Sequence, residues 1–295
     1  MLVLGVALSV LVGVAIGLLG GGGSILMVTL LVYVLALPPH EAIATSLLVV
    51  GATSVAAIVA HARAGRVAWR TGLLFGLAGM VGSFGGARVA RHIPAGLLLV
   101  LFGAVMLATA VAMLRGGATP SQPASSREER STARQAGLAA QGLLVGAVTG
   151  LVGAGGGFLV VPALTLLGGL PMNVAVGTSL VVVALNAFAG FAGHLGASRI
   201  DVELTALVTG AALIGSLVGS RLAGRIPPDA LRRGFGVFVV AMAIFILGQQ
   251  IPESFGVAPG IMLPWAALAA LLTLLVGLVL RAVRRARLPT PRTAP

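Results

Sequence analysis

Two groups of hydrogen-bonding side chains lie in apolar surroundings, and each group occurs twice in the chain. Thr45-Ser46 has a counterpart in Thr178-Ser179, 133 residues later. His61 has a counterpart in His194 at the same spacing. Hydroxyls and imidazoles can donate to a substrate oxygen, or they can cap a helix and bond back to its carbonyls. The histidines can serve as interfacial hydrogen-bonding groups or can contact a proton or substrate. Both interpretations stay open.

Two glycine runs repeat with the same offset. The predicted site residues within them are Gly21, Gly22, Gly23, Gly155, Gly156 and Gly157. No strand pattern precedes the first run and no Gly-Lys-Ser/Thr follows it, so a dinucleotide fingerprint or P-loop is not supported. In a membrane, glycine allows close helix packing. It can also break a helix at mid-depth, where the amides of the next half-helix form an anion site. Because both copies keep the break before a short segment, we expect packing and a substrate site together.

Other chemistries lack the residues they need. The chain has no Cys, which excludes disulfides, thiolate metal sites and cysteine nucleophiles. A serine hydrolase would need a base beside Ser24, whose repeat counterpart is Gly157. The acidic residues of the apolar segments all lie at segment edges: Glu41, Asp201, Glu203, Asp229 and Glu253. A cation pump or proton relay usually has an intramembrane carboxylate. We therefore expect no enzyme activity, no catalytic residue, no metal and no cofactor, and an anionic or neutral solute as substrate.

Composition indicates that a lipid bilayer surrounds these residues. Of the 295 residues, 58% are hydrophobic and only 9% are charged, against about 25% charged in soluble domains. No Asp, Glu, Lys or Arg precedes Glu41. The 19 basic residues are all Arg and gather in short loops and at the C-terminus, with only 4% aromatic residues in the chain. That distribution is typical of membrane topology and excludes nucleic acid as a partner.

The offset of 133 residues holds without a gap from Gly17 to Met113, so the chain contains two copies of one unit. Arg66 aligns with Arg199, and Ile93-Pro94 aligns with Ile226-Pro227. The apolar segments are 2–19, 22–37, 41–62, 70–90 and 95–114, then 136–152, 155–169, 173–195, 203–223 and 230–248, and finally 260–280. Two of them, 22–37 and 155–169, are short for a span of about 20 residues. We expect re-entrant or broken helices there, which leaves the number of crossings open at roughly 8 to 11.

We predict an all-α, polytopic transmembrane helical bundle made of two homologous, inverted repeats with glycine-broken helices. Its parts are residues 1–115 (first repeat), 116–134 (polar cytoplasmic linker), 135–250 (second repeat), 251–281 (extra helix) and 282–295 (basic cytoplasmic tail). Five segments are an odd number, so a second copy is inverted. The charges agree with this inversion. One loop contains Arg63, Arg66 and Arg70, and its counterpart contains Arg199, Asp201 and Glu203. The positive-inside rule therefore favours opposite sides of the membrane for the two loops. Arg88 and Arg91 would then face outward, against the positive-inside rule.

The doubled motif set resembles the sulfite exporter TauE/SafE family of bacterial permeases. The residues are Gly20–Gly23 with Ala44-Thr45-Ser46-Leu47, and Gly153–Gly157 with Gly177-Thr178-Ser179-Leu180, each followed by His and by Arg-Val or Arg-Ile. The likeness covers residues 5 to 248. In this family an acidic residue usually follows the Arg-Val or Arg-Ile dipeptide. Asp201 matches that pattern in the second repeat, whereas the first repeat has Ala68 at the equivalent position. The resemblance implies permeation of an anion such as sulfite or an organosulfur anion, and a multi-pass protein of the bacterial inner membrane.

We therefore expect a permease that exports a small anion by alternating access between the repeats. Two alternatives stay open, a membrane scaffold or assembly protein without transport and an importer of a similar solute. The sequence also leaves open whether the chain forms a homo-oligomer.

Overall fold

The computed structural model describes residues 2–90, 92, 95–115, 132–152, 157–194 and 201–255. Within these ranges the regular structure is helical and contains no strand. The predicted segment 260–280, the basic tail 282–295 and most of the linker lie outside the described residues.

The helices follow the predicted segments closely. They are α1 (Leu2–Leu19), the 3-10 turn η1 (Gly20–Gly23), α2 (Ser24–Tyr33), α3 (Pro39–Arg63), α4 (Trp69–Ala90), α5 (Ala95–Arg115), α6 (Thr132–Val152), α7 (Gly157–Pro162), the π-helical turn η2 (Ala163–Leu167), α8 (Met172–His194), α9 (Val202–Ala223) and α10 (Pro228–Phe255). The last helix runs on from its predicted end at 248 to Phe255.

Local chemistry accounts for where the helices begin. Pro39 occupies the first turn of α3, where its missing N–H costs nothing. Asp201 caps α9, its carboxylate accepting from the Leu204 amide at 3.1 Å. Glu41, Glu203 and Asp229 lie in the first turns of α3, α9 and α10, where the helix dipole favours an anion. The described carboxylates thus lie at helix ends, as predicted.

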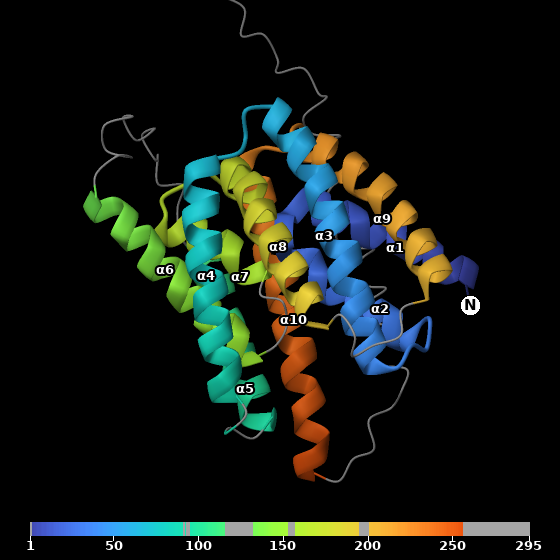
Figure 1. Cartoon of the computed structure of the whole chain (residues 1–295). Helices are drawn as coiled ribbons and strands as arrows, with labels where there is room; N and C mark the ends of the chain where they lie inside the picture. Colours follow the sequence, from blue (N-terminus) through green and yellow to red (C-terminus); the bar gives the residue numbers. More distant parts are fainter. Residues whose placement is uncertain are drawn as a thin grey trace, which may run out of the picture.

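Helices from the two repeats pack in counterpart pairs. Helix α1 packs on α9, and their repeat counterparts α6 and α4 pack on each other (Figure 1). Small residues make both contacts close: a Cβ added at Gly13 would overlap the Ala212 carbonyl, and one at the counterpart Gly146 would overlap the Gly79 carbonyl. Close approach through glycine is the usual packing of membrane helices.

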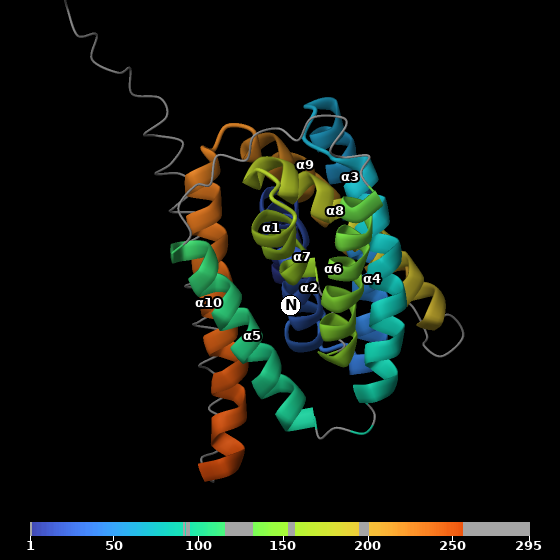
Figure 2. The ribbon, with the colours of Figure 1, turned by 90° about the vertical axis from the view of Figure 1, so that its left-hand side faces the viewer.

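Two further pairs of counterparts, α3 with α8 and α5 with α10, pack on each other directly, and the register of their contacts shows that the helices of each pair run in opposite directions. At one end of the α3–α8 pair Gly190 faces Leu47, and at the other Gly177 faces His61. The pair lies at the centre of the molecule in Figure 1, whereas α5 and α10 form one edge of it in Figure 2.

Four of the described helical spans are long and apolar enough to cross a membrane: Leu2–Leu19, Glu41–Arg63, Met172–Ala192 and Val202–Ala223. Helix α4 also exposes a continuous apolar stripe, in which Leu73, Leu77, Val81 and Phe84 are each 44% to 66% exposed. Soluble monomers rarely expose a contiguous stripe of this kind. An apolar face of this kind is compatible with contact to the lipid of a membrane.

Candidate functional site

The first glycine run breaks a helix, as predicted. Helix α1 ends at Leu19, and Gly20 has a φ of +74°, which only glycine adopts without strain. Gly21, Gly22 and Gly23 then form the 3-10 turn before α2 starts at Ser24. In the second repeat, α6 ends at Val152 and α7 starts at Gly157. Gly155 and Gly156 lie outside the described residues.

The broken segment of the first repeat touches the half-helix of the second. A Cβ added at Gly21 would overlap the backbone of Gly157, and one added at Gly157 would overlap the backbone of Gly21. Gly20 lies against the hydroxyl of Ser179, and Gly157 lies against the side chain of Val183. Two of the predicted site residues, Gly21 and Gly157, therefore touch each other, and a third, Ser179 of α8, contacts the adjoining Gly20.

His61 caps the broken helix. The side chain is fully buried, at 0% exposure, and its Nε2 lies 3.0 Å from the Gly17 carbonyl oxygen. A carbonyl only accepts, so Nε2 carries the proton and Nδ1, which has no partner, faces the interior. Gly17 lies in the last turn of α1, where carbonyls lose their helical partners. A structural role, hydrogen bonding at a helix end, therefore accounts for the contact between His61 and Gly17.

The loop after α3 closes one end of the bundle. The Ala68 amide donates to the Thr178 hydroxyl at 3.0 Å, and Arg66 Nη2 donates to the Ser220 carbonyl at 3.4 Å near the end of α9. We call these four residues the latch. Burial lowers the pKa of the Arg66 guanidinium from its ordinary value, yet an arginine keeps its charge at physiological pH. A cation at a helix C-terminus is stabilised by the helix dipole.

The first Thr-Ser pair lies at the opposite end of α3. Thr45 lies near the end of α8 and Thr178 near the end of α3, so the two threonines are roughly 20 Å apart along the axis at 1.5 Å per residue. Ser46 and Ser179 both bond back within their helices, to Ile43 and Val176 at 2.8 Å. The Thr45 hydroxyl is buried and has no partner.

His194 is the last residue of α8, and its side chain lies outside the described part. The structure therefore brings Thr178 and His61 to one end of the α3–α8 pair and leaves Thr45 and Ser46 at the other.

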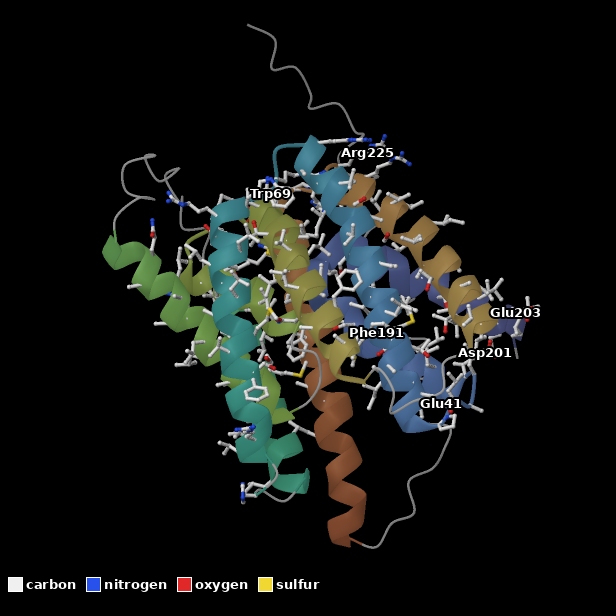
Figure 3. All side chains as sticks on the ribbon, viewed as in Figure 1. Glu41, Trp69, Phe191, Asp201, Glu203 and Arg225 are labelled. Atoms are coloured by element: carbon white, nitrogen blue, oxygen red, sulfur yellow. The ribbon has the colours of Figure 1, made fainter. Side chains whose placement is uncertain are left out.

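Charge divides the molecule between these two ends. Arg225 and Trp69 lie at the latch end in Figure 3, whereas Glu41, Asp201 and Glu203 lie together at the far end. Most of the described arginines lie in the segments that meet at this end. Arg63, Arg66 and Arg70 lie in or beside the loop after α3, Arg221 and Arg225 lie at or just after the end of α9, and Arg232 and Arg233 lie near the start of α10. Arg88, in the last turn of α4, stacks on Phe84 instead, with 4.7 Å from its guanidinium carbon to the ring centre.

Sequence reasoning missed two polar residues in the middle of the α3–α8 pair. The Ser54 Oγ and the Asn186 Oδ1 are buried without hydrogen-bond partners. Their signal in the sequence is a polar residue half-way along a largely apolar segment, a placement that costs free energy in a membrane and indicates function.

Comparison with known families decides the assignment. The family model described as "Sulfite exporter TauE/SafE" matches residues 5–246. The chain belongs to the TauE/SafE family. This TauE/SafE assignment agrees with the resemblance predicted from the doubled glycine and Thr-Ser motifs. It makes the chain a multi-pass membrane protein of a family of probable membrane transporters.

Relatives of this TauE/SafE chain carry transporter names. A "probable membrane transporter protein" of Xylella fastidiosa is 37% identical over 245 residues, covering 81% of this chain and 92% of the relative. The Bacillus subtilis YdhB protein, also named a probable membrane transporter, is 28% identical over 223 residues, covering 75% and 90%. A Methanocaldococcus jannaschii relative with the same description is 26% identical over 259 residues, covering 81% and 94%. No solved structure matches the chain significantly.

Proposed function

We propose that this TauE/SafE protein exports a small anion, sulfite or an organosulfur anion, across the bacterial inner membrane. The observation that carries the proposal is the contact between Gly21 and Gly157, where a broken segment of one repeat meets the half-helix of the other. Broken helices that meet between repeats are where transporters bind substrates, because their backbone groups are free to contact a ligand. The family description supports sulfite as the first substrate to test.

The anion's route would pass from one Thr-Ser pair to the other. Thr178 and Ser179 lie towards the latch end, Thr45 and Ser46 towards the far end, and the glycine contact lies between them. We infer that the hydroxyls line the two approaches and that amides of the two glycine runs, Gly21–Gly23 and Gly155–Gly157, bind the anion beside their contact. His61 supports the end of α1 that bounds this space, and we propose the same kind of role for its repeat counterpart His194.

We propose that the two repeats, residues 1–115 and 135–250, are inverted in the membrane and alternate in opening. The antiparallel packing of α3 on α8 supports this arrangement. Asymmetry between the ends supports the alternation: Thr178 accepts the Ala68 amide, whereas its counterpart Thr45 has no partner. The counterpart of Ala68 is Asp201, which caps α9 instead. A hydrogen bond on Thr178 at one end, without an equivalent on Thr45 at the other, is the kind of asymmetry that alternating access requires.

Orientation follows from the arginines. The positive-inside rule puts the Arg-rich latch end, the linker 116–134 and the tail 282–295 in the cytoplasm. The predicted extra helix has to begin after α10 ends at Phe255, and it adds one more crossing in this orientation. Cytoplasmic arginines attract the anion before export. With the cytoplasm negative, each expelled negative charge gains about 2.3 kcal/mol per 100 mV, so export needs no coupling ion.

Sulfite efflux from proteoliposomes tests the proposal. Vesicles loaded with sulfite and given an inside-negative potassium diffusion potential should lose sulfite faster than protein-free vesicles, and the rate should saturate. With equal sulfite concentrations on both sides of the membrane, reversing the potential should reverse the net flux through a uniporter. Efflux equal to that of protein-free vesicles, with sulfite and with methanesulfonate, would contradict anion transport. Flux that runs only inward under both potentials would contradict export.

A further inference from the structure

The hydroxyl of Ser54, like that of Thr45 near one end of α3, differs from the other buried hydroxyls that the structure describes. Within a helix, Ser and Thr usually bond back to a carbonyl three or four residues earlier. The neighbouring Thr53 does so with Val49 at 2.7 Å and Val50 at 3.0 Å. Ser54 is 0% exposed, lies mid-way along α3, and has no partner for its Oγ. An unpaired hydroxyl in an apolar interior is costly, and packing alone gives no reason to keep it.

A second unpaired oxygen lies at the same depth on α8. A Cβ added at Gly51 would lie 3.0 Å from the ring of Phe188, which fixes the register of the antiparallel pair. Ser54 lies three residues after Gly51 on α3, and Asn186 lies two residues before Phe188 on α8. Because the helices are antiparallel, both offsets run in the same direction along the pair. At 1.5 Å per residue their levels agree within about 2 Å. The Asn186 Oδ1 is buried and, like the Ser54 hydroxyl, lacks a hydrogen-bond partner.

This level lies at the centre of the repeat and beside the glycine contact. Asn186 is the repeat counterpart of Thr53, the neighbour of Ser54, so a symmetry axis between the repeats passes close to both. One turn before Asn186, Val183 packs on Gly157, which in turn touches Gly21. Two unpaired polar groups therefore lie at the depth where the broken segments meet.

We propose that Ser54 and Asn186 bind the anion at the middle of the membrane and select oxyanions. This inference rests on the permease function proposed above. The hydroxyl donates one hydrogen bond, and the carboxamide, whose oxygen and nitrogen exchange by a half-turn, donates a second. Two donors from different helices fit two oxygens on one sulfur or carbon, as in sulfite and sulfonates, better than a single halide. Because neither donor is charged, the anion is held weakly enough to leave.

The test compares the KM for sulfite in three variants. Ser54→Ala and Asn186→Leu each remove one donor, and each should raise KM about tenfold or more, because hydrogen bonds to charged groups are worth about that factor. Thr53→Val is the matched control, since its hydroxyl is already bonded within α3; its KM should stay within about twofold of the wild type. Methanesulfonate should follow sulfite, and chloride should compete poorly with both.

Thermal stability separates binding from a structural role. Without sulfite, Ser54→Ala should melt at or above the wild-type Tm, because it removes an unpaired buried hydroxyl. Sulfite should raise the Tm of the wild type and of Thr53→Val but not that of Ser54→Ala. A Tm that falls in Ser54→Ala without sulfite, together with an unchanged rise on adding it, would overturn the proposal.

A second variant guards against misfolding at position 186. Asn186→Thr installs the residue that the counterpart position already accepts, and its hydroxyl should bond back to α8 as Thr53 does to α3. It should therefore fold and still show the raised KM. If wild-type vesicles move no anion, the proposed function fails. If they do and the Ser54 and Asn186 variants keep the wild-type KM, only this inference fails.

Discussion

At the scale of single residues, the structure gives different roles to side chains that the sequence presented as equivalent. Thr178 belongs to the latch, whereas its counterpart Thr45 has no partner. Ser46 and Ser179 both bond back within their helices, and His61 caps the end of α1. Repetition in the sequence could predict that these residues matter. It could not predict their partners, because Gly17 and Ala68 contribute through backbone atoms that any residue possesses.

Removing the His61 imidazole should destabilise the protein. His61→Leu leaves the Gly17 carbonyl without its donor in a site that water does not reach, which costs about 1–3 kcal/mol. His61→Gln keeps an N–H and should recover much of the loss. The measurement is the Tm of detergent-purified protein, with His92→Leu, an exposed turn residue, as the control. Equal Tm values for His61→Leu and His92→Leu would contradict the capping role.

A methyl group at the glycine contact should stop transport. Gly21→Ala places a Cβ on the Gly157 backbone, which cannot move aside as a flexible side chain could. Gly210→Ala, in α9, meets nothing within 4 Å and should be neutral or more stable by up to about 1 kcal/mol, as alanine favours helix. Sulfite flux checks both variants. Wild-type flux in Gly21→Ala would show that the repeats need not meet closely there.

At the scale of elements, hydropathy and helix-breaking residues predict nearly every boundary. The glycines after Leu19 and the prolines at 38 and 39 end and begin helices for reasons of backbone geometry alone. The register between helices is different. Nothing local in α3 and α8 indicates that Gly51 faces Phe188, so the unpaired Ser54 and Asn186 could not be recognised from sequence as lying at one level.

The two threonines should have unequal effects on the latch end. Thr178→Val removes the acceptor of the Ala68 amide, whereas Thr45→Val removes a hydroxyl that has no partner. A cysteine replacing the buried Ser220 of the latch can report its opening, because the chain has no other cysteine. The rate at which a thiol reagent labels this cysteine should rise about fivefold in Thr178→Val, because a hydrogen bond contributes about 1 kcal/mol. Thr45→Val should label like its parent. Equal rates in the two variants would contradict the latch.

At the scale of the whole molecule, odd segment number and arginine placement predict inverted repeats. Cysteines at Ala64 and at Ser198, one in each loop between counterpart helices, should therefore react with a membrane-impermeant thiol reagent from opposite faces. The cysteine at Ala64 should react from the cytoplasm. Labelling of both from one face would leave the repeats parallel, and the alternating mechanism would have to be withdrawn.

The most direct measurement of the central claim is access of an anion to the glycine contact. A cysteine replacing Val183, which packs on Gly157, should react with an anionic, membrane-impermeant methanethiosulfonate in a variant that still carries sulfite currents. Sulfite should slow the reaction, and completed reaction should block the current. A Val183→Cys protein that transports sulfite yet never reacts, from either face, would place the anion's path elsewhere and contradict the account.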